Sequence, residues 1–287
     1  MIRGSLRLSF DPARWREMVT FSLPLVPSGL GVLLTTYVDR YAIVSLLSLD
    51  DLGRYSVAFR LASVVGVAMA GVVSAVAPLM YQHHHEPTTP AQIARMFQWF
   101  LAAALPLVLF LGMFAPELVR LVAPAEYASV APVVLLLSAT ILVASCYNFA
   151  PGLWIAKRTG WIAVIGLTTG ALNLALNFVL VPRFGLIGAG LSAFGSATIA
   201  CGAHLACSQR FYPIPFSWPS LLSAGALVAV AGGLVVWGPP GAWVLPGWPE
   251  PAVRGVAWLV VSGAVVALLI GAADLHLASR RLRRVLS

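Results

Sequence analysis

Long apolar runs occur along the whole chain, and they limit the folds open to it. Examples are Leu101–Met113, Val133–Cys146 and Leu221–Trp237. Inside a bilayer every backbone polar group must be paired within the protein, so only helices and closed barrels can span it. Barrel strands are about ten residues long and alternate in polarity, whereas these runs are uniformly apolar. The pattern therefore predicts an all-α, polytopic membrane helix bundle.

Composition supports the same conclusion, because 60% of the 287 residues are hydrophobic and only 10% are charged. Soluble proteins are about 25% charged. Pro116–Tyr127 is expected to form a short interfacial helix and turn. With about 20 residues for each crossing, the sequence predicts about eight transmembrane helices, at roughly 17–46, 52–81, 93–114, 129–155, 159–181, 186–210, 218–237 and 254–275.

Basic residues predict the orientation of these helices. With eight crossings, most of the arginines fall on one side, which the positive-inside rule makes cytoplasmic. We therefore expect a multi-pass protein of the cell (inner or plasma) membrane with both termini in the cytoplasm. The net charge of +8 is then explained by topology and contacts with membrane lipids rather than by nucleic acid. The residues on the cytoplasmic side are Arg3, Arg7, Arg14, Arg16, Lys157, Arg158, Arg210, Arg280, Arg281, Arg283 and Arg284.

Charged residues gather in the first predicted hairpin, and they are the leading candidates for a binding site. Asp39 and Arg40 lie in the first predicted span, and Arg54 and Arg60 in the second. An ionisable group at membrane depth costs at least about 2.5 kcal/mol, so it usually has a function. Arg60 is expected near mid-bilayer. It either lines a water-filled cavity that attracts an anionic substrate such as a pyrophosphate, or pairs with Asp39.

Two further groups in the predicted spans have both a structural and a functional interpretation. Pro24 and Pro27 interrupt the first span, as in a kinked helix or in the hinge of an alternating-access transporter. Asn173 and Asn177 share one face of the fifth span with Thr169. That face is typical of packing between membrane helices, and a sugar-contacting face would look the same.

Motifs for chemistry are not evident. No nucleophile elbow, P-loop or HExxH motif occurs, so neither an enzyme nor a cofactor is predicted. Three consecutive histidines, His83 to His85, precede Glu86 in a predicted cytoplasmic loop. They cannot all face one ion from a regular helix, so a solvated loop is preferred over a metal site. The Asp50–Asp51 pair could belong to a membrane transferase, but it stands alone at a tight turn.

Three segments resemble bacterial polysaccharide and O-antigen flippases of the multidrug/oligosaccharidyl-lipid/polysaccharide exporter superfamily. Phe21–Tyr55, with LPLVPSG and VDRYAI, is similar to the start of the second half of these proteins. Phe114–Leu137 resembles their short outer helix and the span after it. Ala156–Ala193, with its Asn…Asn…Pro-Arg-Phe-Gly pattern, is the most specific of the three.

The resemblance implies a flippase in lipopolysaccharide or related polysaccharide biosynthesis. Such proteins move undecaprenyl-pyrophosphate-linked oligosaccharide across the inner membrane through a cationic cavity between two six-helix lobes. Arg60, Arg40, Asp39 and Arg54 occupy the corresponding positions. By this resemblance, residues 1–16 form a basic cytoplasmic leader, 17–212 the six-helix C-terminal lobe, and 213–287 an extra helix pair with a basic tail.

Eight helices would supply one lobe, so the other wall of the cavity must come from elsewhere. The chain could be a fragment, half of a split transporter, or a protein that assembles with itself. A missing N-terminal lobe or a second copy is therefore an expected partner. Alternative functions are export of lipid-linked peptidoglycan precursor or of drugs by a relative in the same superfamily, and a non-transporting scaffold or inactive remnant.

Overall fold

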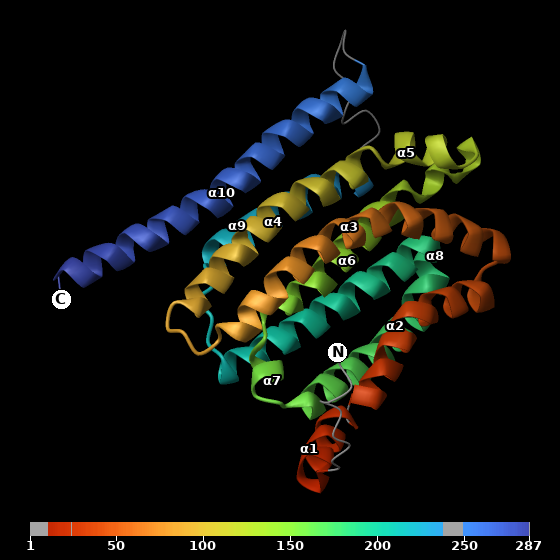
Figure 1. Ribbon diagram of the computed structural model, residues 1–287. Helices are drawn as coiled ribbons and strands as arrows, with labels where there is room; N and C mark the ends of the chain where they lie inside the picture. Colours follow the sequence, from red (N-terminus) through yellow and green to blue (C-terminus); the bar gives the residue numbers. More distant parts are fainter. Residues whose placement is uncertain (1–10, 24, 238–248, 287) are drawn as a thin grey trace, which may run out of the picture.

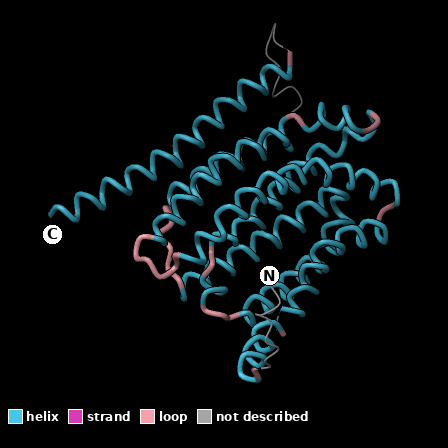
Figure 2. Tube along the Cα trace, in the orientation of Figure 1, coloured by secondary structure: helices cyan, strands magenta, loops and turns pink. Residues whose placement is uncertain are grey.

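Helices make up nearly all of the protein in its computed structural model, which describes residues 11–23, 25–237 and 249–286 (Figure 1). No strand occurs in these ranges, and short loops join the helices (Figure 2). The predicted all-α bundle is confirmed. In chain order, the helices are α1 (Pro12–Ser22), α2 (Leu25–Leu46), α3 (Leu49–Gln82), α4 (Thr89–Met113), α5 (Ala115–Val122), η1 (Ala125–Val130), α6 (Ala131–Cys146), η2 (Tyr147–Phe149), α7 (Gly152–Ile155), α8 (Thr159–Phe211), α9 (Trp218–Trp237) and α10 (Glu250–Leu286).

Five helical segments of the described chain are long and apolar enough to cross a membrane. They are α3, α4, α6 with η2, α8, and the Glu250–Gly271 part of α10. The long helices lie side by side (Figure 1). We call the end with the α2–α3 connection and α5 the turn end. The opposite end, with the α3–α4 connection and α7, is the loop end.

One of the five, α8, is a helical hairpin that supplies two crossings. Gly185 has φ +57°, a conformation that L side chains rarely adopt. Beyond it the chain returns alongside itself: a Cβ on Gly188 would lie 2.2 Å from the Leu180 carbonyl oxygen, and the side chains of Asn173 and Ser196 are hydrogen-bonded. Gly185 therefore separates a first arm from a second arm, in agreement with the predicted spans 159–181 and 186–210.

The first predicted span, 17–46, is divided by the structure. Asp11 caps α1 by accepting from the Ala13 N–H at 2.9 Å, and Pro12 occupies the first turn, where a proline costs no hydrogen bond. α1 ends at Ser22 and α2 begins at Leu25. The apolar pattern alone did not reveal this break.

The predicted fourth span, 129–155, is also shorter than expected. α6 ends at Cys146, and η2 and α7 follow as separate short turns. Pro151 precedes α7 and cannot donate a backbone hydrogen bond. By contrast, the interfacial helix expected within Pro116–Tyr127 is present as α5 followed by η1.

The last two helices pack against α4. The Trp258 indole N–H donates to the Pro106 carbonyl at 2.9 Å. At the turn end, the Arg254 guanidinium donates to the Met113 carbonyl at 3.3 Å and pairs with the Glu117 carboxylate at 3.2 Å. These contacts join α10 to both α4 and α5, opposite the side of the bundle that carries α2.

Candidate functional site

Asp39 is the centre of a buried polar network at the junction of α2, α3 and α8. Its carboxylate accepts from the Tyr55 hydroxyl at 2.9 Å through Oδ2. Through Oδ1 it accepts from the Asn177 amide at 2.7 Å. Asp39 and Tyr55 are almost wholly buried, at 5% and 2% exposure. A carboxylate deep among helices is thus held by two neutral donors.

The network continues between the two arms of α8. The Asn177 amide also donates to the backbone carbonyl of Asn173 at 3.0 Å and to its Oδ1 at 3.2 Å. The Asn173 amide in turn donates to the Ser196 hydroxyl at 3.0 Å. Asn177 Oδ1 is buried and has no partner among the described residues. These bonds join α2, α3 and both arms of α8 into one unit.

This geometry favours the helix-packing interpretation of the asparagine face. Asn173 and Asn177 lie on one side of α8, as predicted, but they are 1% and 0% exposed. All their described hydrogen bonds go to protein groups. In this conformation they have no surface to offer a sugar.

Arg60 does not pair with Asp39, because the Asp39 carboxylate is already occupied by Tyr55 and Asn177. The Arg60 side chain is exposed, and among the described residues it has no ion pair. Arg60 is eleven residues after Leu49, about 16 Å along α3. The 21 residues from Leu61 to Tyr81 carry no charge, which suffices for one crossing. Arg60 therefore lies at the turn-end boundary of this apolar run.

Arg40 is partly buried, and its guanidinium lies against two aromatic rings. Its guanidinium carbon lies 5.7 Å from the centre of the Tyr37 ring and 5.1 Å from that of Phe59. Such cation–π contacts contribute about 0.5–2 kcal/mol, depending on solvation. No carboxylate of the described chain forms an ion pair with Arg40.

Arg54 has a structural environment at the turn end. It pairs with Asp50 one helical turn earlier at 2.8 Å and lies 5.9 Å from the centre of the Tyr127 ring of η1. Asp51 is part of the cap of α3: the Ser48 hydroxyl donates to its carboxylate at 2.7 Å and accepts from its backbone N–H at 3.1 Å. Both acidic residues of the predicted pair therefore serve the start of α3.

The two prolines of the predicted hinge lie, in the sequence, next to the junction of α1 and α2. Pro24 lies outside the described residues. Pro27 falls within the bounds of α2, but its side chain is also outside the described part. The break between α1 and α2 lies at this point of the chain, and the hinge remains a prediction.

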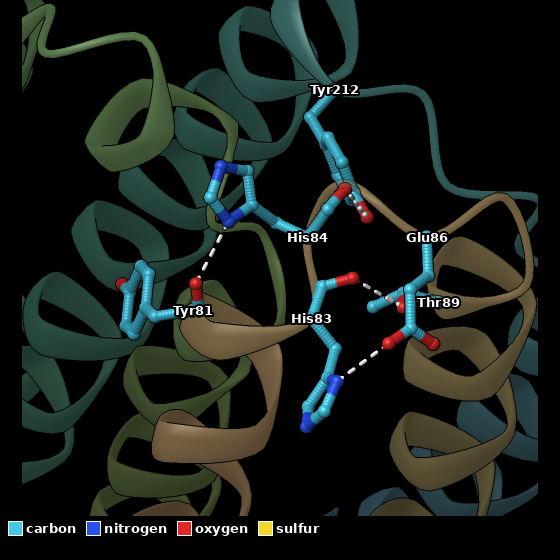
Figure 3. A network of polar contacts seen from close by, with 6 residues as sticks. All are labelled: Tyr81, His83, His84, Glu86, Thr89 and Tyr212. Atoms are coloured by element: carbon cyan, nitrogen blue, oxygen red, sulfur yellow. Dashed lines mark hydrogen bonds and ion pairs between the residues drawn. The ribbon is translucent and has the colours of Figure 1, made fainter.

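The histidine run forms the α3–α4 loop, as expected (Figure 3). His83 Nδ1 lies 2.7 Å from a Glu86 carboxylate oxygen, and both side chains are about half exposed. The Thr89 hydroxyl donates to the His83 carbonyl at 2.7 Å, and the Tyr212 hydroxyl to the His84 carbonyl at 3.2 Å. Within the described ranges, no three His, Cys, Asp or Glu side chains are grouped to hold a metal ion. These contacts secure the loop against the end of α8.

Tyr55 and Ser196 belong to the network but were not predicted. A usable signal existed for Tyr55, because it and Asp39 are equally far from residue 47 in the α2–α3 turn, and such positions meet in an antiparallel helix pair. Ser196 is similarly opposite Asn173 across Gly185. Pairing each intramembrane polar residue across the nearest predicted turn would have found both.

A multi-pass helical membrane protein with a buried polar network and unpaired arginines is the class that this fold and site define. The family described as "Polysaccharide biosynthesis protein" matches residues 1–146, just over half of the chain. The chain belongs to this polysaccharide biosynthesis family.

A curated relative is a "Probable low-salt glycan biosynthesis flippase Agl15" of Haloferax volcanii. It is 21% identical over 224 residues, which cover 74% of this chain and 48% of the relative. The chain thus spans about half the length of that protein. No solved structure matches the chain. The printed name of this relative describes that protein as a probable flippase of glycan biosynthesis.

Proposed function

We propose that the chain forms one half of a flippase that moves a polyprenyl-pyrophosphate-linked oligosaccharide across the cell membrane. The observation that carries the proposal is the pair of arginines on α2 and α3. Arg40 and Arg60 lie within long apolar helices and have no ion pair among the described residues. Arg54 and Arg254, in contrast, pair with carboxylates. Guanidinium groups without a salt bridge suit a diphosphate, which they can bind by charge-assisted hydrogen bonds.

The charge distribution also separates the substrate classes. An exporter of cationic drugs would need carboxylates that its ligand can reach. Asp39 is instead enclosed by Tyr55 and Asn177 inside the helix junction. Lipid-linked peptidoglycan precursor, which is also an anionic pyrophosphate, remains the alternative substrate. A scaffold without transport activity would not need Arg60. The effect of an Arg60 substitution on transport therefore distinguishes a transporter from a scaffold.

The architecture fits a half-transporter that needs a second wall. Residues 17–212 are proposed as the six-helix lobe and 213–287 as the extra pair, since α9 and α10 lie against α4 rather than within the α2–α3–α8 junction. A missing N-terminal lobe or a second copy would complete the cavity. Both termini are proposed to face the cytoplasm, which makes the loop end the cytoplasmic end.

Reconstitution tests the proposal directly. The chain is placed in liposomes with fluorescent polyprenyl-pyrophosphate oligosaccharide, and movement between leaflets is followed by quenching with an added membrane-impermeant reductant. We expect Arg60→Ala to lower the rate by about 10- to 100-fold, because a hydrogen bond to a charged group contributes about 1.5–3 kcal/mol. The Arg60→Lys variant should retain part of the wild-type transport rate. Arg120→Ala, at an exposed arginine of α5, is the control. A wild-type rate no higher than that of protein-free liposomes would refute transport by the self-assembled chain. Rates of the Arg60→Ala and Arg120→Ala variants that are equal and above this background would refute the role of Arg60.

A further inference from the structure

The two faces of α2 have opposite character near its turn end. One face is buried and carries the Asp39 network. The other is largely exposed and carries two tyrosines, and Arg40 at its edge lies over the Phe59 ring of α3. The buried face consists of Val38, Asp39, Ala42 and Ile43, and the opposite face of Tyr37, Arg40, Tyr41 and Val44.

Tyr37 and Tyr41 form an aromatic shelf on the outward face. They are one helical turn apart and therefore lie on the same side of α2. Tyr37 is 57% and Tyr41 64% exposed. The Tyr41 hydroxyl makes no hydrogen bond within the described part of the chain. Two exposed rings thus lie on this side of α2, and one of them, Tyr37, contacts the guanidinium of Arg40.

A membrane-interface belt of tyrosines would also leave these rings exposed, but the Tyr37 ring contacts a cation: the carbon of the Arg40 guanidinium lies 5.7 Å from the ring centre. This guanidinium forms no salt bridge among the described residues. This face of α2 is therefore suited to a polar ligand rather than to hydrocarbon.

The chemistry of a glycan linked to a lipid pyrophosphate matches this arrangement. One face of a sugar ring presents C–H groups, which pack on the electron-rich face of an aromatic ring. Its hydroxyls can bond to a tyrosine hydroxyl at the ring edge. The phosphate next to the first sugar would meet the guanidinium, which Tyr37 and Phe59 hold in place.

We infer that Tyr37 and Tyr41 stack against the first sugar of the lipid-linked glycan while Arg40 binds the neighbouring phosphate. This inference rests on the proposed function, and it assigns the sugar and the phosphate to different side chains of one helix face. It predicts that the tyrosines distinguish a glycosylated lipid from a bare one, whereas the arginine does not.

Binding measurements on the full chain in lipid nanodiscs test the assignment. The two probes are fluorescent polyprenyl pyrophosphate carrying one sugar and the same lipid without sugar. We expect Tyr41→Ala to weaken binding of the glycosylated probe by about tenfold and to leave the bare probe unchanged. Arg40→Ala should weaken both probes. Tyr41→Trp keeps an aromatic face and should retain preference for the sugar.

The possible results of these measurements test the aromatic shelf and the proposed function separately. Tyr81→Ala, at a half-exposed tyrosine at the loop end, is the matched control and should change neither affinity. If Tyr41→Ala weakens both probes equally, or neither, the sugar shelf is wrong even though the flippase proposal stands. If the wild-type chain binds neither probe above an uncharged polyprenol, the proposed substrate class fails, and the shelf fails with it.

Discussion

Replacing Asn177 with leucine would test the Asp39 network as the element that joins α2 to α8. The Asn177 amide donates to Asp39 at 2.7 Å and to Asn173 at 3.0 and 3.2 Å. Leucine has a similar volume but no donor, so one oxygen of the buried Asp39 carboxylate loses its partner. Leaving a buried acceptor unsatisfied costs about 1–3 kcal/mol, and more when it is charged.

In a membrane, the free-energy cost of losing a hydrogen bond is smaller than in water. Hydrogen bonds between membrane helices contribute on average about 0.6 kcal/mol, since the unfolded chain in the bilayer also finds partners. Combining the lost bonds with the uncompensated carboxylate, we expect Asn177→Leu to lower the free energy of unfolding by about 2–4 kcal/mol. Tyr55→Phe removes one neutral donor to Asp39, and about 1 kcal/mol is expected.

Equilibrium unfolding in detergent micelles, followed by intrinsic fluorescence, measures the difference. Asn148→Leu is the matched control, because the Asn148 amide is only partly buried and bonds to Ser145 in the preceding turn at 2.9 Å. It should cost less than about 1 kcal/mol. If Asn177→Leu is no more destabilising than Asn148→Leu, Asp39 does not depend on its neighbour in α8, and the reasoning is wrong.

Three further outcomes are expected elsewhere in the fold. Gly188→Ala would place a Cβ 2.2 Å from a carbonyl of the first arm of α8. The peak of folded protein should therefore be lost from size-exclusion profiles. The control, Gly202→Ala, adds a Cβ that meets nothing within 4 Å and should behave like wild type. Arg254→Ala removes the partner of Glu117 and should lower the unfolding free energy by about 1–3 kcal/mol in micelles. His83→Ala breaks a half-exposed pair and should change stability by less than about 1 kcal/mol, and a chelator should leave the melting temperature unchanged.

The general plan of the bundle could be predicted because each crossing needs its own run of apolar residues. The boundary at residues 182–185 was also visible, since Pro182 and Gly185 interrupt an apolar stretch that is too long for one crossing. The structure shows why glycine is needed there: Gly185 has φ +57°. The break between α1 and α2 was missed, because the hydrophobicity does not change where one helix ends and the next begins.

The partners of the charged residues could not be predicted in the same way. Asp39 and Asn177 are 138 residues apart in the chain, and only the packing of α2 against the α8 hairpin brings them together. One of the two interpretations of Arg60 from the sequence made it the counter-ion of Asp39. Neutral donors from Tyr55 and Asn177 occupy that position instead, so membrane depth showed which residues were unusual but not how their charges are satisfied.

Asp39 and Arg40 are consecutive residues of α2, one buried and the other partly exposed, which makes a coupling between the buried network and the exposed face testable. If α2 moves, Arg40 and Tyr37 must shift relative to the Phe59 ring of α3. The hydrogen bonds of Asp39 oppose this movement because they tie α2 to α8. Loosening the network with Tyr55→Phe should therefore weaken ligand binding only when Arg40 is present. In a double-mutant cycle of Tyr55→Phe with Arg40→Ala, measured as affinity for a polyprenyl pyrophosphate, we expect an interaction energy above about 0.5 kcal/mol. Strictly additive effects would mean that the two faces of α2 act independently, and that the network stabilises the fold without positioning Arg40.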